Sequence, residues 1–209
     1  MFPGRLRILP ERKFRSMAAK KTCPWPSNDP LMIKYHDTEW GVPLHDDRKL
    51  FEFLVLDAFQ AGLSWAIILK KRKNFRKAFD NFHPVRIAKY SAGDVKRLLN
   101  DEGIIRNRAK IEATITNARK FLEVKKEFGS FDKYIWQFTN HGTVRNGYKT
   151  LKELPAKTSQ SDAMSTDLKE RGFKFVGSTI CYAFMQAAGM VNDHLVHCFR
   201  YKQMSSSAG

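Results

Sequence analysis

The chain has 209 residues, of which 43% are hydrophobic and 28% are charged, which is the composition of a globular protein with its own core. It contains no apolar run of about 18 residues, so we expect no membrane span, and its basic N-terminus lacks the apolar stretch of a secretory signal. Three cysteines exclude a disulfide scaffold and suit a reducing compartment, so we expect a cytoplasmic protein.

The charge balance gives the first indication of function. Lysine and arginine number 37 against 21 aspartates and glutamates, for a net charge of +16. A compact protein with this excess attracts polyanions, of which nucleic acid is the first candidate and an anionic membrane surface the second. The sequence shows no basic helix with an apolar face, which a membrane surface would favour. The alternative is that the charge serves only solubility.

The N-terminal segment is predicted to be separate from the folded part of the chain. Residues 1–20 are basic and have no regular period, so we expect a mobile tail, with Met17 as an alternative start. The folded domain is expected over residues 21–202, and residues 203–209 are expected to be frayed. Residues 23–43 contain four prolines and many aromatic residues, which predicts irregular structure.

A helical period begins after this segment. One of two consecutive aspartates is expected to cap a helix over residues 46–59. The sequence Ala-Gly-Leu-Ser at 61–64 breaks the period, and a strongly basic helix is predicted over 65–77. Pro84 is expected at the first position of a short helix.

Two further helices are predicted from a cap and from an apolar face. Ser91 and Asp94 have the spacing of a capping box and would begin a helix over residues 94–100, which Gly103 closes. The next helix is indicated by four apolar residues that fall on one helical face: Ile111, Ile115, Ala118 and Leu122.

The C-terminal half is also predicted to be helical. One helix is expected to be capped by Ser161 and to end at Gly172, and another is expected over residues 177–188. Only residues 142–148 show an alternation that would suit a strand. The sequence therefore predicts an all-α domain of many short helices.

Two cysteines and two histidines form a candidate metal site. Cys23 and His36 are near the start of the folded part, and His194 and Cys198 are four residues apart, on one face of an expected helix. Two thiolates and two imidazoles are a common structural zinc set, which would join the two ends of the domain. The alternative is that they are ordinary buried residues, which is what we expect of Cys181.

Asp57 lies in the apolar stretch Val-Leu-Asp-Ala-Phe, where a carboxylate is costly unless it has a partner. It would either cap a helix or pair with arginine, or else face a pocket. Aromatic walls and a negative charge would suit a flat, cationic ligand, although a single tryptophan is more often a core residue. The candidate walls are Trp25, Tyr35, Trp40 and Trp65.

A glycine-containing turn over residues 168–179 joins the last two predicted helices. Gly177, Ser178 and Thr179 would begin the second helix with free N–H groups, which can bind phosphate. A helix–hairpin–helix binds the DNA backbone without reading sequence, and the positive charge, including that of Lys174, favours this interpretation over an ordinary helix–helix turn.

Together these stretches resemble the DNA-3-methyladenine glycosylase I family of the helix–hairpin–helix superfamily. The similar motifs occur in family order over about residues 22–200 and leave the tail outside. They are Cys-Pro-Trp at 23–25, Asp-Pro-Leu at 29–31, Tyr-His-Asp-x-Glu-Trp-Gly-Val-Pro at 35–43, Gln-Ala-Gly-Leu-Ser-Trp at 60–65, Gly-Ile-Ile-Arg-Asn at 103–107, Arg-Gly-Phe-Lys-Phe-Val-Gly at 171–177, Thr-Ile-Cys-Tyr at 179–182 and Val-Asn-Asp-His at 191–194.

The resemblance implies an α-helical enzyme that flips a damaged base out of duplex DNA and holds a structural zinc. It implies that Tyr35 and Trp65 line the base pocket with Trp25 nearby, and that Gly62 and Leu63 approach the gap left by the flipped nucleotide. Residues 172–177 fall on the hairpin of the family. With the helix start that follows, the predicted DNA-binding residues there are Lys174, Gly177, Ser178 and Thr179. The implied zinc ligands are Cys23, His36, His194 and Cys198.

One position departs from the family pattern. Asp57 stands where the family usually has a glutamate that contacts the extruded base. Aspartate keeps the charge but is one methylene, or about 1.5 Å, shorter. A water could bridge the gap, or the helix could lie closer to the base. Met32 stands where the family often has an aromatic residue.

The sequence thus predicts a monomeric glycosylase that hydrolyses the N-glycosidic bond in alkylated double-stranded DNA and releases free 3-methyladenine without cleaving the strand. Asp57 is the candidate catalytic residue, and the enzyme would be associated with the nucleoid through DNA. One alternative is a non-catalytic binder of damaged DNA, in which the shorter carboxylate reflects lost activity. Another is a basic nucleic-acid packaging module, which leaves the aromatic pocket unexplained.

Overall fold

The computed structural model describes residues 20–206, so the predicted tail lies outside this range except for Lys20. The described part is mostly helical, as predicted, and none of its helices combines the length and apolarity that a membrane crossing needs. The helices are α1 (Pro30–Thr38), α2 (Asp47–Gln60), α3 (Trp65–Ala78), α4 (Pro84–Ile87), α5 (Ala92–Leu99), α6 (Arg108–Phe128), α7 (Phe131–Trp136), α8 (Ser159–Glu170), α9 (Ser178–Ala187) and α10 (Phe199–Ser206). Short 3-10 turns are η1 (Asp80–Phe82), η2 (Gln137–Thr139) and η3 (Leu151–Glu153), and the two strands are β1 (Val144–Arg145) and β2 (Val191–Asn192).

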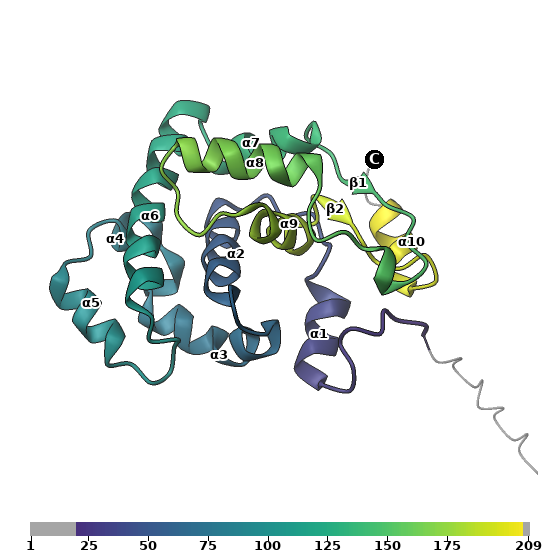
Figure 1. Cartoon of the computed structure of the whole chain (residues 1–209), viewed down its shortest axis with the longest axis horizontal. Helices are drawn as coiled ribbons and strands as arrows, with labels where there is room; N and C mark the ends of the chain where they lie inside the picture. Colours follow the sequence, from purple (N-terminus) through teal and green to yellow (C-terminus); the bar gives the residue numbers. More distant parts are fainter. Residues whose placement is uncertain (1–19, 207–209) are drawn as a thin grey trace, which may run out of the picture.

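Helix α2 forms the centre of the molecule. All ten residues from Leu50 to Phe59 are buried, including two carboxylates, Glu52 and Asp57. The helix contacts α3, α6, α7 and α9, and Figure 1 shows it enclosed by its neighbours. A helix that is covered on every side has no solvent-facing stripe for charged residues. Any charged side chain in this stretch of α2 therefore lies in the interior.

Several helix starts agree with the sequence. The Asp46 side chain accepts a hydrogen bond from the N–H of Lys49 at 2.9 Å and caps α2. Ser91 and Asp94 form the expected capping box of α5, and Pro84 occupies the first turn of α4. These caps satisfy N–H groups that have no partner within their own helix.

Two boundaries differ from the prediction. Helix α5 covers Ala92–Leu99 against the predicted 94–100, and Gly103 lies in a turn where the Asp101 side chain accepts a hydrogen bond from the N–H of Gly103 at 2.7 Å. Helix α8 is capped by Thr158, and Ser161 is the third helical residue of a reciprocal capping box. The two side chains are of the same kind, so the sequence alone does not show which of them is the cap.

The segment 23–43, predicted to be irregular, contains α1. Pro30 is at the start of this helix, where its missing N–H has no cost, and Asp29 caps it by accepting from the N–H of Leu31 at 2.8 Å. The prolines that suggested irregular structure therefore include one that begins a helix.

The last described residues are helical. Residues 203–206, for which the sequence predicts fraying, lie in α10, and Met204 is 8% exposed. Burial of this apolar side chain stabilises the last turn. Residues 207–209 lie outside the described range. Lys20 places its ammonium 5.0 Å from the ring centroid of Phe199, which brings the start of the described chain to α10.

The predicted strand at 142–148 is present only as β1, which pairs in parallel with β2 in the register Val144 to Val191. Gly189, just before β2, has φ +71°, and a Cβ there would lie 2.4 Å from the carbonyl carbon of Val42. The N–H of Leu44 also bonds the carbonyl of Ala188 at 3.0 Å. The segment after α1 is thus packed against the end of α9 so closely that a side chain at position 189 would not fit.

We expect Gly189→Ala to lower the free energy of unfolding by more than about 3 kcal/mol, because it adds a backbone clash to an unfavourable φ. Gly62→Ala is the matched control, since Gly62 has φ +79° but nothing within 4 Å of its Cβ position. It should lose only about 1–2 kcal/mol. Denaturant unfolding measures both, and equal losses would contradict the close approach at Gly189.

Candidate functional site

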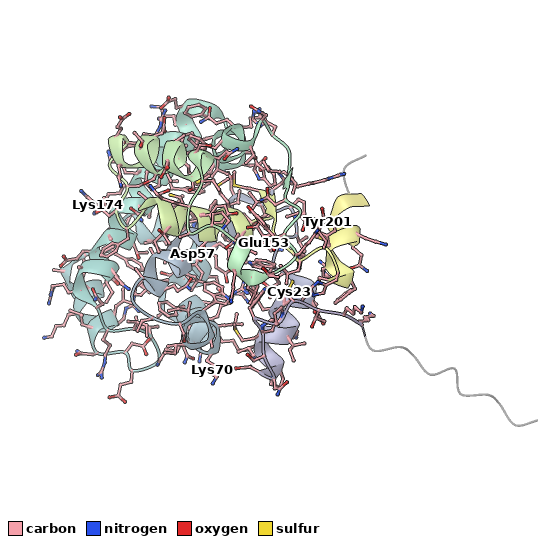
Figure 2. The ribbon with its side chains drawn as sticks, turned by 45° about the vertical axis from the view of Figure 1, so that its right-hand side comes forward. Cys23, Asp57, Lys70, Glu153, Lys174 and Tyr201 are labelled. Carbon is pink, nitrogen blue, oxygen red and sulfur yellow. The ribbon has the colours of Figure 1, made fainter. Side chains whose placement is uncertain are left out.

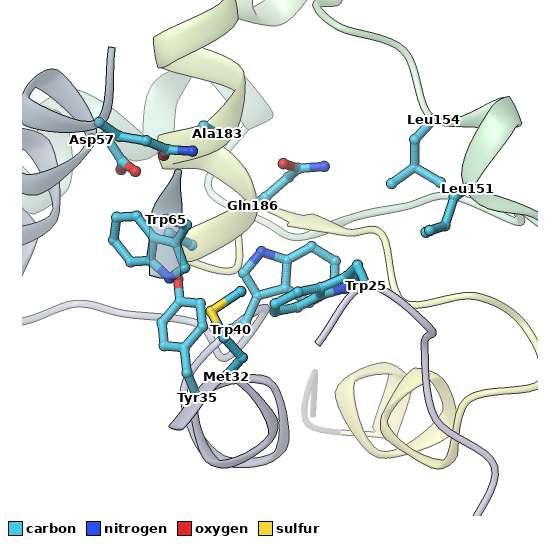
Figure 3. Close-up of a pocket in the computed structure, with 12 residues that line it drawn as sticks. Trp25, Met32, Tyr35, Trp40, Asp57, Trp65, Leu151, Leu154, Ala183 and Gln186 are labelled. Atoms are coloured by element: carbon cyan, nitrogen blue, oxygen red, sulfur yellow. The ribbon is translucent and has the colours of Figure 1, made fainter. Parts of the chain in front are cut away.

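A pocket of about 240 Å³ lies between α1, α2, α3 and α9, and Figure 3 shows its lining. The four aromatic residues predicted as walls all line it, together with Asp57 and Met32. Asp57 and Trp65 lie at one end of the pocket, and two leucines in and next to the η3 turn lie at the other. The lining residues are Trp25, Met32, Tyr35, Trp40, Asp57, Gln60, Trp65, Leu151, Leu154, Ala183, Gln186 and Ala187.

The aromatic walls form two contacting pairs. The ring centroids of Tyr35 and Trp65 are 5.3 Å apart, and those of Trp25 and Trp40 are 5.1 Å apart. The indole N–H groups of Trp25 and Trp65 are buried and have no hydrogen-bond partner. Buried tryptophan N–H groups normally have a partner, so these two donors are available to a ligand.

Asp57 lines this pocket, and one of its carboxylate oxygens has no hydrogen-bond partner in the protein. The residue is 2% exposed, and its Oδ2 has no hydrogen bond. Burial raises the pKa of Asp57 well above its ordinary value, and the charge of Arg72 opposes this rise. The alternative interpretation, in which Asp57 caps a helix or pairs with arginine, finds no support among the bonds of the described residues.

Arg72 is occupied by other carboxylates. Its Nε donates to Glu52 at 2.6 Å and its Nη1 donates to Glu39 at 2.6 Å, while the guanidinium lies 5.1 Å from the Phe53 ring centroid. These bonds connect α3 to α2 and to the end of α1. Because this arginine already has two carboxylate partners, its charge acts on Asp57 only from a distance and does not neutralise it in a salt bridge.

Tyr35 is 3% exposed and lies beside the same carboxylate. Burial raises the pKa of Tyr35, and the charge of Asp57 adds to the effect. The phenol therefore stays neutral and offers an aromatic face to the pocket.

Asp193 belongs to a separate hydrogen-bonded cluster. Its carboxylate accepts bonds from the Tyr182 hydroxyl at 2.6 Å, the Asn146 amide at 2.7 Å and the Gln186 amide at 2.8 Å. Three donors satisfy this buried group, so it orients Gln186 at the pocket wall and is not itself a free acceptor.

The four predicted metal ligands come together next to the pocket, where the Trp40 ring centroid lies 4.7 Å from that of His194. The candidate ligand atoms of Cys23, His36, His194 and Cys198 all lie within 4.8 Å of one another, and all four residues are buried. His194 Nδ1 lies 3.2 Å from His36 Nε2, 3.7 Å from Cys198 Sγ and 3.8 Å from Cys23 Sγ. This cluster could hold a metal ion. His194 and Cys198 are joined by a turn before α10 rather than by the expected helix.

The other nitrogen of each histidine has a partner outside the cluster. His36 Nδ1 lies 2.6 Å from a carboxylate oxygen of Asp37, and His194 Nε2 lies 3.1 Å from the Trp40 carbonyl oxygen. Such contacts hold a metal-binding imidazole in one tautomer and orient its free nitrogen. Cys181 lies elsewhere, buried in the core as expected.

The two loops implied in DNA binding have different exposures. Leu63 is 38% exposed in the loop between α2 and α3. Lys174 is exposed in the turn between α8 and α9, and Thr179 is exposed in the first turn of α9, where the Ser178 hydroxyl lies 2.9 Å from that of Ser161. Phe175, also 38% exposed, has φ +56°, which is unusual for an aromatic residue. Figure 2 shows Lys174 at the edge of the molecule.

Sequence reasoning did not find Gln60, Gln186 or the two leucines near η3 as pocket residues. Gln60 is the first residue of a quoted motif, but Gln186 reaches the pocket only through the packing of α9 on α2. No local pattern in a sequence records such packing.

The fold of this helical domain is that of solved DNA glycosylase structures. A crystal structure of 3-methyladenine DNA glycosylase I superposes with a TM-score of 0.84 at 51% identity, covering 86% of this chain and 98% of that one. A Staphylococcus aureus structure described as the basis of 3-methyladenine recognition by 3-methyladenine DNA glycosylase I has a TM-score of 0.83 at 35% identity, covering 87% and 97%.

The sequence comparisons agree with the structural ones. DNA-3-methyladenine glycosylase 1 of Escherichia coli (strain K12) is 54% identical over 179 residues, which is 86% of this chain and 96% of that protein. The family described as methyladenine glycosylase matches residues 25–201. The chain belongs to the methyladenine glycosylase family, which confirms the predicted resemblance and the prediction of a glycosylase enzyme.

The raised pKa of Asp57 predicts a pH-dependent stability difference. The folded protein holds this proton more tightly than the unfolded chain, so the contribution of Asp57 to stability falls as pH rises from about 3.9 through the raised folded value. Asparagine is neutral throughout. We therefore expect Asp57→Asn to gain stability relative to the unchanged protein as pH rises over this window.

Denaturant unfolding at a series of pH values measures this difference. Glu170→Gln, at an exposed position of α8, controls for the change in net charge. The free energies of unfolding of Asp57→Asn and of the unchanged protein are compared at each pH. If their difference stays constant with pH, the burial of an unpartnered carboxylate is contradicted.

Proposed function

We propose that this enzyme removes 3-methyladenine from alkylated double-stranded DNA by flipping the base into the aromatic pocket and hydrolysing its N-glycosidic bond. The observation that supports this most directly is the buried, unpartnered Oδ2 of Asp57 among aromatic rings. The E. coli relative and the solved neighbours are named for the same activity.

The lesion itself supplies much of the driving force for bond cleavage. Methylation at N3 gives adenine a positive charge and weakens its bond to the sugar, and the base leaves as a neutral molecule. Strong acid catalysis is therefore unnecessary. The protein has to extrude the base, orient it and stabilise the charge that develops on the sugar while water attacks.

The pocket residues select the lesion by its charge. Aromatic faces at Tyr35 and Trp65 attract a cationic ring more strongly than a neutral one. A cationic base also gives the Asp57 carboxylate the partner that the protein does not provide, and this favours the ionised form of the acid. Neutral adenine provides no such compensation. The free N–H groups of Trp25 and Trp65 can bond polar atoms on the base edge.

The two exposed loops would hold the duplex. Gly62 and Leu63 would enter the space vacated by the flipped nucleotide, since Leu63 is an exposed apolar side chain. The connection of α8 and α9 would act as a helix–hairpin–helix, with backbone N–H groups at Gly177, Ser178 and Thr179 facing phosphate and Lys174 adding charge. In this proposal the enzyme acts as a monomer on DNA in the cytoplasm.

We expect the protein to release 3-methyladenine from methylated duplex DNA, without strand cleavage, in an assay that identifies the liberated base. Asp57→Asn should lower kcat/KM by roughly 30-fold or more, which corresponds to a lost charged interaction of ~2 kcal/mol. Asp57→Glu tests whether reach limits the reaction.

The assay also separates the proposed enzyme from a non-catalytic binder. Because Asp57 is shorter than glutamate, a binder that retains the pocket but has lost turnover is the second candidate. Tight binding of methylated DNA with no base release by folded protein would favour that candidate. Unchanged turnover in Asp57→Asn would reject the role given to Asp57.

We further propose that the cysteine and histidine cluster holds a structural zinc ion. Zinc bonds of about 2.3 Å to sulfur and about 2.0 Å to nitrogen give a tetrahedron with edges of about 3.3–3.8 Å. Four of the six distances among the ligand atoms run from 3.2 to 3.8 Å, which is this size, and all six are within 4.8 Å. Bound there, zinc would supply no chemistry to the pocket and would hold the segment before α1 against the segment before α10.

We expect one zinc per chain by elemental analysis, and loss of both the metal and thermal stability in Cys198→Ser. Cys181→Ser is the matched control, because Cys181 is equally buried but lies outside the cluster. Its metal content should be unchanged. Metal-free protein after mild purification, or equal metal loss in both variants, would contradict the assignment.

A further inference from the structure

Helix α6 has a buried polar stripe that the proposed glycosylase activity does not use. Lys110, Thr114 and Asn117 are 7%, 2% and 1% exposed, and their spacing places them on one face of the helix. Polar residues in such positions are costly unless each has a partner. Two of the three find that partner in the loops proposed to contact DNA.

Lys110 binds the end of α2. Its ammonium donates to the carbonyl oxygens of Phe59 at 2.8 Å and Ala61 at 2.6 Å. Carbonyls at the C-terminus of a helix have no partner within that helix and bear partial negative charge, so they favour a cation. The bond to Ala61 fixes the residue immediately before Gly62 and Leu63.

Asn117 binds the turn between α8 and α9. Its Oδ1 accepts from the N–H of Lys174 at 2.7 Å, and its Nδ2 donates to the carbonyl of the same residue at 2.9 Å. Because both bonds go to the backbone of Lys174, they fix the position and the orientation of that residue. The next residue is Phe175, whose positive φ needs a surrounding structure that holds it.

Both loops are therefore hydrogen-bonded to the same helix, α6. Lys110 and Asn117 are seven residues apart, which is about 10.5 Å along a helix. Figure 1 shows α6 beside α2 and beside the connection of α8 to α9. Thr114 lies between them. Its hydroxyl donates to the carbonyl of Lys110 in the same helix at 2.8 Å, so it holds neither loop.

We propose that Lys110 and Asn117 are positioning residues that fix the spacing of the two loops, so that a duplex engages both at once without contacting either side chain. This inference rests on the proposed function, because it assumes that both loops bind DNA. A preset spacing removes the entropy cost of ordering each loop when DNA binds, and it makes the second contact effectively intramolecular.

The test compares Lys110→Met and Asn117→Ala with Thr114→Val, which removes a buried hydroxyl of the same stripe. Affinity for a duplex containing an abasic-site analogue should fall about tenfold, or ~1.4 kcal/mol, in each of the first two. It should be unchanged in Thr114→Val. Affinity for free 3-methyladenine should be unchanged in all three, because the pocket is intact.

Two further readouts separate positioning from other roles. A side chain that does not touch phosphate should leave the salt dependence of DNA affinity unchanged when it is replaced. If Lys110 instead bound phosphate directly, Lys110→Met would reduce the salt slope by about one. The double variant should lose less affinity than the product of the two single losses, since releasing one loop already abolishes the spacing.

The outcomes are distinct. Folded variants with unchanged duplex affinity, a reduced salt slope in Lys110→Met, or equal loss in Thr114→Val would each overturn the inference. If the unchanged protein neither binds duplex DNA nor releases base, the proposed function fails and this inference fails with it. Lys110→Gln and Asn117→Ser provide a second pair if a first variant does not fold, as judged by circular dichroism.

Discussion

The burial of α2 is the constraint on which the rest of the structure depends. This helix is enclosed by its neighbours along ten residues, yet it includes Asp57. The nearby cation, Arg72, is committed to Glu39 and Glu52, so the interior leaves one carboxylate oxygen unsatisfied at the pocket. An unsatisfied buried charge is unfavourable in the free protein and favours a cationic ligand. The same helix thus forms the core and, in the proposed function, gives the pocket its selectivity.

The pocket and the cysteine and histidine cluster share a structural support. Tyr35 and His36 are neighbours on α1, where Tyr35 lines the pocket and His36 joins the cluster. Trp25 lies two residues after Cys23 and is likewise at the pocket. The cluster connects this N-terminal segment to residues more than 150 positions later, so it places one aromatic wall against a core built by α2, α3 and α9.

Residues with strong local signals were predictable, and residues defined by packing were not. The caps at Asp46 and Ser91 and the helix start at Pro84 follow from side-chain chemistry at the helix end, and Asp57 is conspicuous as one charge in an apolar run. The stripe on α6 is not predictable, because Lys110 and Asn117 resemble solvent-facing residues until the partners on α2 and on the α8–α9 turn are known. Helix α1 was not predicted, because a proline can either break a helix or begin one and the sequence around it suggested the first.

All three cysteines of the sequence are 2% exposed. Thiolates are among the strongest nucleophiles in proteins, and the methylating electrophiles that damage adenine also attack sulfur. A repair enzyme with a surface thiol would be modified under the same conditions that create its substrate. Enclosing Cys23 and Cys198 in the cluster and Cys181 in the core protects this chain from the reagents whose damage it would correct.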